Sequence, residues 1–136
     1  MYIFKTSGKT FNNVIKYQKH AYKIPLKNWD PGEIVLVSKN KADCNRQEKQ
    51  IQYIMKIDSI TPSGPEVISK YWPGFGNKWN YLIHCTDTKH LVQPFNLEDI
   101  LDAQQCKGYH GIMTFKRLET RDEALVIEYI NKFGTY

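Results

Sequence analysis

Hydrophobic residues along this chain fall into short stretches rich in β-branched and aromatic side chains, a pattern typical of strands. In one of these stretches the apolar residues stand at every second position, as on a strand with one buried face. We therefore expect Ile51, Tyr53, Met55 and Ile57 to share a face. The strands predicted in this way cover residues 2–6, 34–37, 51–60, 79–84, 91–94 and 111–118.

Apolar residues recur at helical spacing in three further segments. Thr10 is placed to cap a short first helix, and Asn96 with Asp99 opens a second short helix that runs to residue 101. The first helix has an apolar face formed by Phe11, Val14 and Ile15.

The last predicted helix is the most clearly marked element. Thr120 and Glu123 have the spacing of a capping box, and Gly134 is expected to end the helix. The residues between them that recur at helical spacing are Leu125, Val126, Tyr129, Ile130 and Phe133.

The order of these elements indicates the fold class. Strands and helices do not alternate regularly, which favours an α+β domain over a doubly wound parallel sheet. A chain of 136 residues is the size of one domain, so we predict a single domain over residues 1–136. It is expected to be a small, bent, partly closed β-barrel of about six strands with three short flanking helices. Residues 39–50 are polar and mixed in charge, which suits an exposed, mobile hairpin loop.

Several classes of protein are excluded by composition. No apolar run approaches the ~20 residues of a membrane-spanning helix. The first residues lack the apolar core and cleavage site of a signal peptide. The three cysteines, Cys44, Cys85 and Cys106, are odd in number and widely spaced, which indicates reduced thiols rather than a disulfide framework. We therefore expect a cytoplasmic protein with no membrane partner.

Positive charge is concentrated at one end of the chain. The first 29 residues carry six lysines and no acidic residue. Residues 30–70 hold six basic and six acidic side chains, and residues 71–136 hold seven basic and eight acidic ones. The formal net charge of +5 therefore resides in the N-terminal segment. Such asymmetry favours a polyanionic partner, and the alternative is an ordinary solvated face.

An aromatic cluster over residues 71–81 is the second unusual feature. Five of its eleven residues are aromatic, interleaved with Pro, Gly and Asn. Tyr81 continues into a predicted strand and is expected to be in the core. Trp72 precedes Pro-Gly-Phe-Gly and is expected in a loop, where a large apolar ring is usually explained by a ligand or partner. Aromatic faces stack on bases and lysines hold phosphates, so the two features together favour nucleic-acid binding over catalysis.

Motifs for other chemistry are incomplete. Gly8-Lys9-Thr10 matches the end of a phosphate-binding P-loop, but the required earlier glycine is Ile3, so a strand-to-helix turn is the better interpretation. The metal-type residues lack the close spacing of a structural zinc site, and nothing marks a thiol as activated. We predict no catalytic residue, no metal and no cofactor. The metal-type residues considered are His84, Cys85, His90, Cys106 and His110.

Five segments, over residues 2–7, 16–25, 31–37, 54–57 and 79–83, stand in an order that resembles the PUA-like superfamily, specifically its EVE and YTH branches of modified-base readers. The resemblance covers roughly residues 2–133, and no single motif is specific. Three residues depart from the family pattern: Tyr22 stands where a Trp is usual, Lys23 replaces a glycine, and Glu33 replaces an Asp.

The resemblance implies a mechanism in which a modified base is flipped, or taken from a single strand, into an aromatic pocket between the barrel and the first helix. Tyr22 and one of Trp72 and Trp79 are then expected to form the walls of this pocket, with Ser7 and Asn12 bonding the edge of the base. Lysines are expected to hold the flanking phosphates, so that affinity falls with salt. The lysines implied are Lys5, Lys9, Lys19 and Lys23.

The chain also resembles the N-terminal specificity module of McrB-type modification-dependent restriction GTPases. This implies DNA with a modified base as the partner, together with a downstream GTPase motor domain and a nuclease subunit.

Two alternatives stay open. One is an RNA-binding PUA-like domain that acts on tRNA or messenger RNA. The other is a small nucleotide or base hydrolase, with Asp87, Glu98 and Asp99 as candidate acids or bases by type.

Overall fold

The computed structural model describes residues 1–40, 50–109 and 115–136, and in these residues six strands form one sheet. The order across the sheet is β2-β5-β4-β3-β1-β6. β1 runs parallel to β3, and the other neighbouring strands are antiparallel. The strands are β1 (Tyr2–Thr6), β2 (Lys19–Tyr22), β3 (Ile34–Lys39), β4 (Ile51–Pro62), β5 (Tyr81–Phe95) and β6 (Phe115–Arg117).

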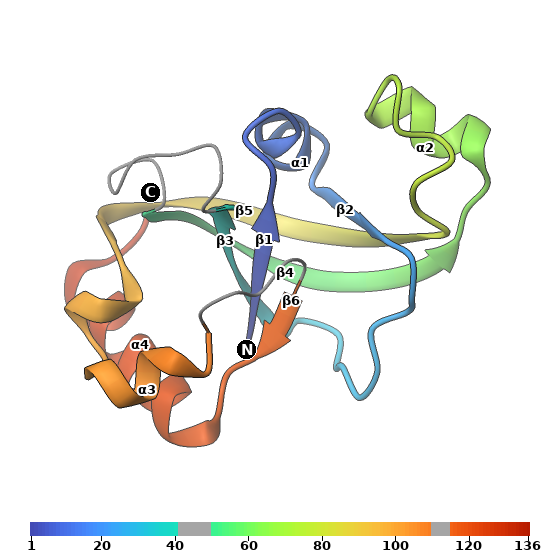
Figure 1. Cartoon of the computed structure of the whole chain (residues 1–136). Coiled ribbons are helices and arrows are strands. Elements are labelled where there is room, and N and C mark those ends of the chain that lie inside the picture. Colours follow the sequence, from blue (N-terminus) through green and yellow to red (C-terminus); the bar gives the residue numbers. More distant parts are fainter. Residues whose placement is uncertain (41–49, 110–114) are drawn as a thin grey trace.

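Four α-helices and one 3-10 helix accompany the sheet in the described residues. In Figure 1, α3 and α4 lie at the lower left, while α1 and α2 lie along the upper side. No helix in the described ranges is long and apolar enough to cross a membrane. The helices are α1 (Phe11–Tyr17), α2 (Pro65–Tyr71), the 3-10 helix η2 (Leu97–Asp99), α3 (Ala103–Lys107) and α4 (Thr120–Phe133).

The long hairpin of β4 and β5 gives the sheet its curvature. Both strands bend together in Figure 1, and their pairing shifts register at three places along the hairpin. Such bulges bend a strand and increase its twist, so the sheet closes into a half-barrel. The predicted α+β fold with a small, bent, partly closed barrel is therefore confirmed.

Each face of the sheet buries a separate apolar cluster. The first cluster includes Phe4 and lies beneath α1 and α2; the second includes Ile3 and lies against α3 and α4. Ile3 and Phe4 are neighbours in β1 and point to opposite faces, as alternation in a strand requires. A register shift between Ile51 and Tyr53 places Ile51 in the second cluster, whereas Tyr53 packs against the first. The prediction that these two residues share a face was wrong, because a bulge interrupts the alternation.

Several predicted elements differ from the structure. The strands predicted over 79–84 and 91–94 are parts of one continuous strand, β5. β2, α2 and α3 were not predicted. Pro65 occupies the first helical position of α2, directly after the N-cap Gly64. The predicted loop over 39–50 falls largely on residues 41–49, and the strand over 111–118 partly on 111–114, both outside the described residues.

The start of α4 is capped differently from the prediction. Glu119 is the N-cap residue, Thr120 is already helical, and no side-chain capping bond is present. The Glu123 carboxylate instead lies 3.4 Å from the Met1 amino group, so the capping box was wrong. Gly134 follows the last helical residue with φ 82°, a conformation that glycine adopts readily, as predicted.

Candidate functional site

A cavity of about 500 Å³ opens beside the first apolar cluster, and we call it the aromatic pocket. Its volume lies within the range of small-molecule sites. It is bordered by the end of β1, by β2, by the start of α1 and by the loop between α2 and β5. The lining residues are Lys5, Thr6, Ser7, Thr10, Val14, His20, Ala21, Tyr22, Lys23, Ile24, Asn40, Trp72, Phe75, Lys78, Trp79 and Phe115.

Strand pairing and a tight loop bring these segments together. β2 pairs with the start of β5, and alternation along β2 directs His20 and Tyr22 to the same face. Trp72 follows the last residue of α2 as its C-cap. The loop then returns to β2, where the Asn80 main-chain N–H donates to the Tyr22 carbonyl at 2.9 Å. Residues far apart in sequence thus line one cavity.

Ring-to-ring packing fixes the aromatic walls. On one side His20 stacks on Tyr22, with ring centroids 4.5 Å apart and planes 16° from parallel. On the other, Phe75 stacks on Trp79 at 5.4 Å and 5°, and Trp72 meets Trp79 edge-on at 5.5 Å. Tyr22 and Trp72 are 2% exposed, so their rings are packed in the core, whereas Phe75 and Trp79 are half-buried.

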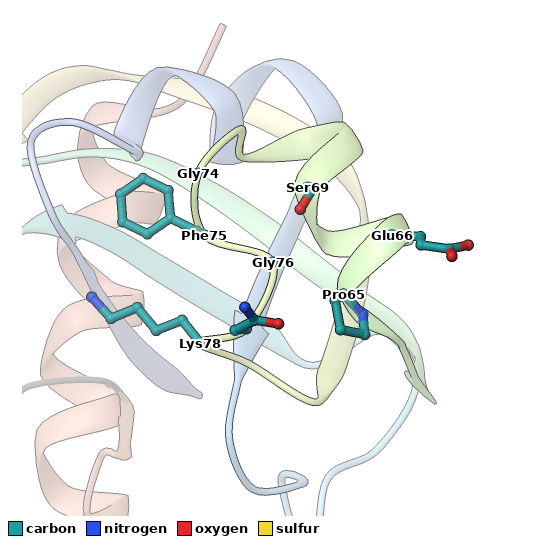
Figure 2. Close-up of a pocket in the computed structure, with 8 residues that line it drawn as sticks. Pro65, Glu66, Ser69, Gly74, Phe75, Gly76 and Lys78 are labelled. Atoms are coloured by element: carbon teal, nitrogen blue, oxygen red, sulfur yellow. The ribbon is translucent and has the colours of Figure 1, made fainter.

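The loop that carries Phe75 is locked against α2 by a close approach at Gly76. A β-carbon at this position would lie 2.7 Å from the Pro65 carbonyl oxygen and would also collide with the Ser69 hydroxyl. A second, shallow groove of about 720 Å³ runs along this contact (Figure 2). Phe75 and Lys78 line both the groove and the aromatic pocket, and Figure 2 shows their side chains extending away from Ser69 and Pro65. The two hollows are therefore neighbours.

A hydroxyl network forms the floor of the pocket near the start of α1. The Thr6 and Thr10 hydroxyl oxygens lie 2.7 Å apart, and the Ser7 hydroxyl lies 3.0 Å from that of Thr10. Thr10 occupies the N-cap position of α1, but its hydroxyl is used in this network and makes no capping bond to the helix. Gly8-Lys9-Thr10 is the predicted strand-to-helix turn.

All charged side chains that line the pocket are cationic in the described part of the chain. They are Lys5, Lys23 and Lys78. The Lys78 ammonium lies 5.3 Å from the Phe75 ring centroid and 5.7 Å from that of Trp79, so it sits over the aromatic wall. The imidazole of His20 carries no charge near neutral pH, because burial lowers its pKa to about 4. The site is thus an apolar cavity with a positive rim.

Most of the residues expected at the site line this cavity. Ser7, Tyr22, Trp72 and Trp79 do so, as do Lys5 and Lys23 among the lysines. Their roles toward a base and its phosphates remain predictions.

Three expected residues lie outside the lining. Asn12 is exposed on α1, and Lys9 is exposed before it. The Lys19 ammonium sits over the Tyr71 ring, 5.4 Å from its centroid. Asn12, Lys9 and Lys19 therefore do not line the cavity, and their roles toward a base and its phosphates stay predictions.

Sequence reasoning missed several lining residues. His20 had a usable signal, because it stands two positions before Tyr22 and alternation in a strand gives both the same face. Phe75 and Lys78 belong to the aromatic cluster and could have been included with it. Phe115 had no signal, since it reaches the pocket through the pairing of β6 with β1.

Among the described residues, those considered for catalysis or metal binding do not converge, and His110 lies outside the described residues. Asp87 forms an exposed pair with Lys56 at 3.6 Å, and Asp99 belongs to the capping box of η2. Burial raises the pKa of the Cys85 thiol to about 12, which keeps it protonated and unreactive. The described residues contain no group of three His, Cys, Asp or Glu side chains suited to a metal ion.

Comparisons with known proteins identify the fold. No family model matches the sequence, and no curated protein matches it significantly. The solved structure of ASCH from Zymomonas mobilis superposes with a TM-score of 0.65 at 8% identity, covering 93% of each chain. A variant of that protein gives 0.67 at 9% identity, covering 93% of this chain and 96% of its own. Rpa0253 from Rhodopseudomonas palustris gives 0.53 at 14% identity, covering 93% of this chain and 90% of its own.

These similarities define the architecture of the chain. It has the PUA-like fold of ASCH domains, so the predicted PUA-like architecture is confirmed. At identities of 8–14% the likeness concerns the fold alone. The resemblance to EVE and YTH domains is finer than these matches and belongs to the proposal that follows.

Proposed function

We propose that this chain is a nucleic-acid-binding module that takes one base into the aromatic pocket. The observation that carries the proposal is the combination of aromatic walls with a lining whose described charges are all lysines. Base–aromatic stacking contributes roughly 1–3 kcal/mol, and a lysine rim attracts the phosphates on either side of the base. A small neutral ligand would use the walls but leave the lysines unexplained.

The residues that line the pocket also bear on whether the chain catalyses a reaction. The carboxylates considered for a hydrolase, Asp87, Glu98 and Asp99, do not line the aromatic pocket. Acid–base catalysis needs a positioned proton donor or acceptor near the reacting atoms, and the neutral imidazole of His20 is held at an unusually low pKa of about 4. We therefore propose binding without turnover.

The more specific form of the proposal is that the base is a modified one in DNA. Its support is the resemblance of the ordered segments to EVE and YTH readers and to the McrB-type specificity module. In that form the chain selects the target for a restriction system, and a GTPase motor and a nuclease act on the bound DNA. RNA is the competing partner, because the same walls and lysines serve either polymer and only RNA offers a 2′-hydroxyl.

The test is fluorescence-anisotropy binding to matched DNA duplexes carrying no modification, 5-methylcytosine or N6-methyladenine, with single-stranded DNA and an RNA duplex alongside. Trp79→Ala removes a half-buried wall of the pocket, and Trp29→Ala is the matched control, because Trp29 packs on the same apolar cluster without lining the pocket. We expect only Trp79→Ala to weaken binding by about tenfold.

The outcomes test separately whether a base enters the pocket and whether the partner is DNA or RNA. Preference for a methylated duplex supports a DNA reader, and preference for RNA supports the RNA alternative. Binding of every polymer with equal affinity, unaffected by Trp79→Ala, would show that no base enters the pocket and would overturn the proposal.

A further inference from the structure

A large apolar side chain at the edge of the aromatic pocket is open to solvent. Ile24 is 63% exposed and also lines the cavity, so it lies at the mouth. An isolated exposed aliphatic side chain needs no explanation by itself. Of the large apolar side chains exposed in the described part of the chain, however, Ile24 is the one that lines the pocket. The others are Val67, Val92, Leu125, Ile127 and Tyr136.

The backbone on both sides of Ile24 is anchored to the fold. The Asn80 side-chain amide donates to the Lys23 carbonyl at 3.4 Å, directly before Ile24. Leu26, two residues after it, is 4% exposed and belongs to the first apolar cluster. Pro25 follows Ile24 directly and favours an extended backbone at the residue before it. Ile24 therefore projects from a backbone that loses little freedom when a partner binds.

The side chains around Ile24 give the mouth two kinds of chemistry. Lys23 and Lys78 are exposed and also line the cavity, so their ammonium groups lie at its rim. Ammonium groups attract phosphates, whereas an aliphatic side chain gains nothing from a phosphate and gains free energy when apolar surface covers it. In a nucleic acid that apolar surface is the face of a base. The mouth is thus suited to contact a base as well as the backbone.

The nucleotides next to the bound base must pass this mouth. When a base of a duplex moves into a protein pocket, it leaves a gap between its two former neighbours in the stack. Opening a stack costs free energy, and proteins that do so insert apolar side chains such as Ile or Leu between the bases. A single strand has no such gap, because its bases are not held in a duplex stack.

We propose that Ile24 enters the gap left by the base that occupies the aromatic pocket, and that the pocket therefore takes its base from a duplex. The rim lysines hold the backbone while the Ile24 side chain packs against the neighbouring bases. This inference rests on the proposed function and adds the form of the nucleic acid and the residue that holds its stack open.

The test compares Ile24→Ala with wild type on three forms of one sequence, in whichever polymer binds more tightly: an intact duplex, a duplex mismatched at the target base, and the single strand. Ile24→Ala is expected to weaken binding of the intact duplex by on the order of tenfold. The mismatched duplex should lose less, because its stack is already loosened. Binding of the single strand should not change.

The matched control is Val67→Ala. Val67 is 44% exposed on α2 and does not line the aromatic pocket, so this variant should bind all three forms as wild type does. Because Ile24 and Val67 are both exposed, neither substitution should lower the melting temperature. A direct readout is a 2-aminopurine next to the target base: its fluorescence should rise on binding when the stack opens, and rise less with Ile24→Ala.

The failures are distinguishable. If Trp79→Ala leaves the binding of every form unchanged, no base enters the pocket and the proposed function fails. If Trp79→Ala weakens binding but Ile24→Ala does not, or if Ile24→Ala weakens the single strand as much as the duplex, base binding stands and this inference is wrong. Binding of the single strand with no binding of the intact duplex would also overturn it.

Discussion

The lysines of the pocket rim make a quantitative prediction about salt. Lys5, Lys23 and Lys78 line the cavity, so a bound single strand can place about three phosphates within their reach. For single strands the logarithm of the binding constant falls by ~0.7 per neutralised phosphate for each unit of log salt, which gives a slope of about −2. Raising salt from roughly 50 to 200 mM should then weaken binding by on the order of 20-fold.

The perturbation is Lys23→Gln combined with Lys78→Gln. Both side chains are exposed, so the substitutions should leave the fold unchanged. About one phosphate contact remains, and the same change in salt should weaken binding by only about threefold. The assay is fluorescence anisotropy with one single-stranded oligonucleotide over a series of salt concentrations.

The matched control changes the net charge by the same amount elsewhere. Lys107→Gln with Lys132→Gln alters exposed lysines on α3 and α4, which Figure 1 shows together at the lower left. This pair should keep the wild-type slope. Equal slopes for wild type, rim variant and control would refute the assignment of phosphates to the rim. Equal losses in both double variants would mean that overall charge, and not the pocket, controls binding.

Four further predictions concern stability. Phe4→Ala, at a fully buried residue packed edge-on against His20 and Tyr22, should lower the free energy of unfolding by about 3–5 kcal/mol. This is seen as a lower urea midpoint with an unchanged slope. Tyr109→Phe removes a 2.5 Å hydrogen bond to the buried Asp122 carboxylate and should cost about 1–3 kcal/mol in urea unfolding. Burial and this bond raise the pKa of Tyr109 from 10.0 to about 12. The stability linked to this raised pKa is therefore present below pH 10.0 and lost as pH rises through about 12. A wild-type unfolding free energy that stays constant between these pH values would contradict this prediction. Gly76→Ala should lower the stability measured in thermal melts by about 1–3 kcal/mol and weaken base binding by displacing the loop. Gly64→Ala, with open space around Gly64, is the control and should be nearly neutral. Equal melting temperatures for the two variants would contradict the close approach at Gly76.

Local patterns predicted the elements that depend on local chemistry. The strand over residues 2–6, the first helix and the last helix with Gly134 after it follow from alternation, helical spacing and backbone preference, which act within a few residues. Prediction failed where a non-local partner decides. β2 is only four residues long and is a strand because it pairs with β5. Ile51 changes face because a bulge in the long hairpin shifts the register.

The sequence by itself determined the ingredients of the site: lysines concentrated in the first 29 residues, and an aromatic cluster over 71–81. These are properties of composition and order, and folding does not alter them. Only the tertiary structure decided which of these side chains meet. It joined His20, Trp72 and Phe115 around one cavity and left Asn12 in solvent. The physical reason is that strand pairing and loop packing act over long sequence separations, which local pattern does not encode.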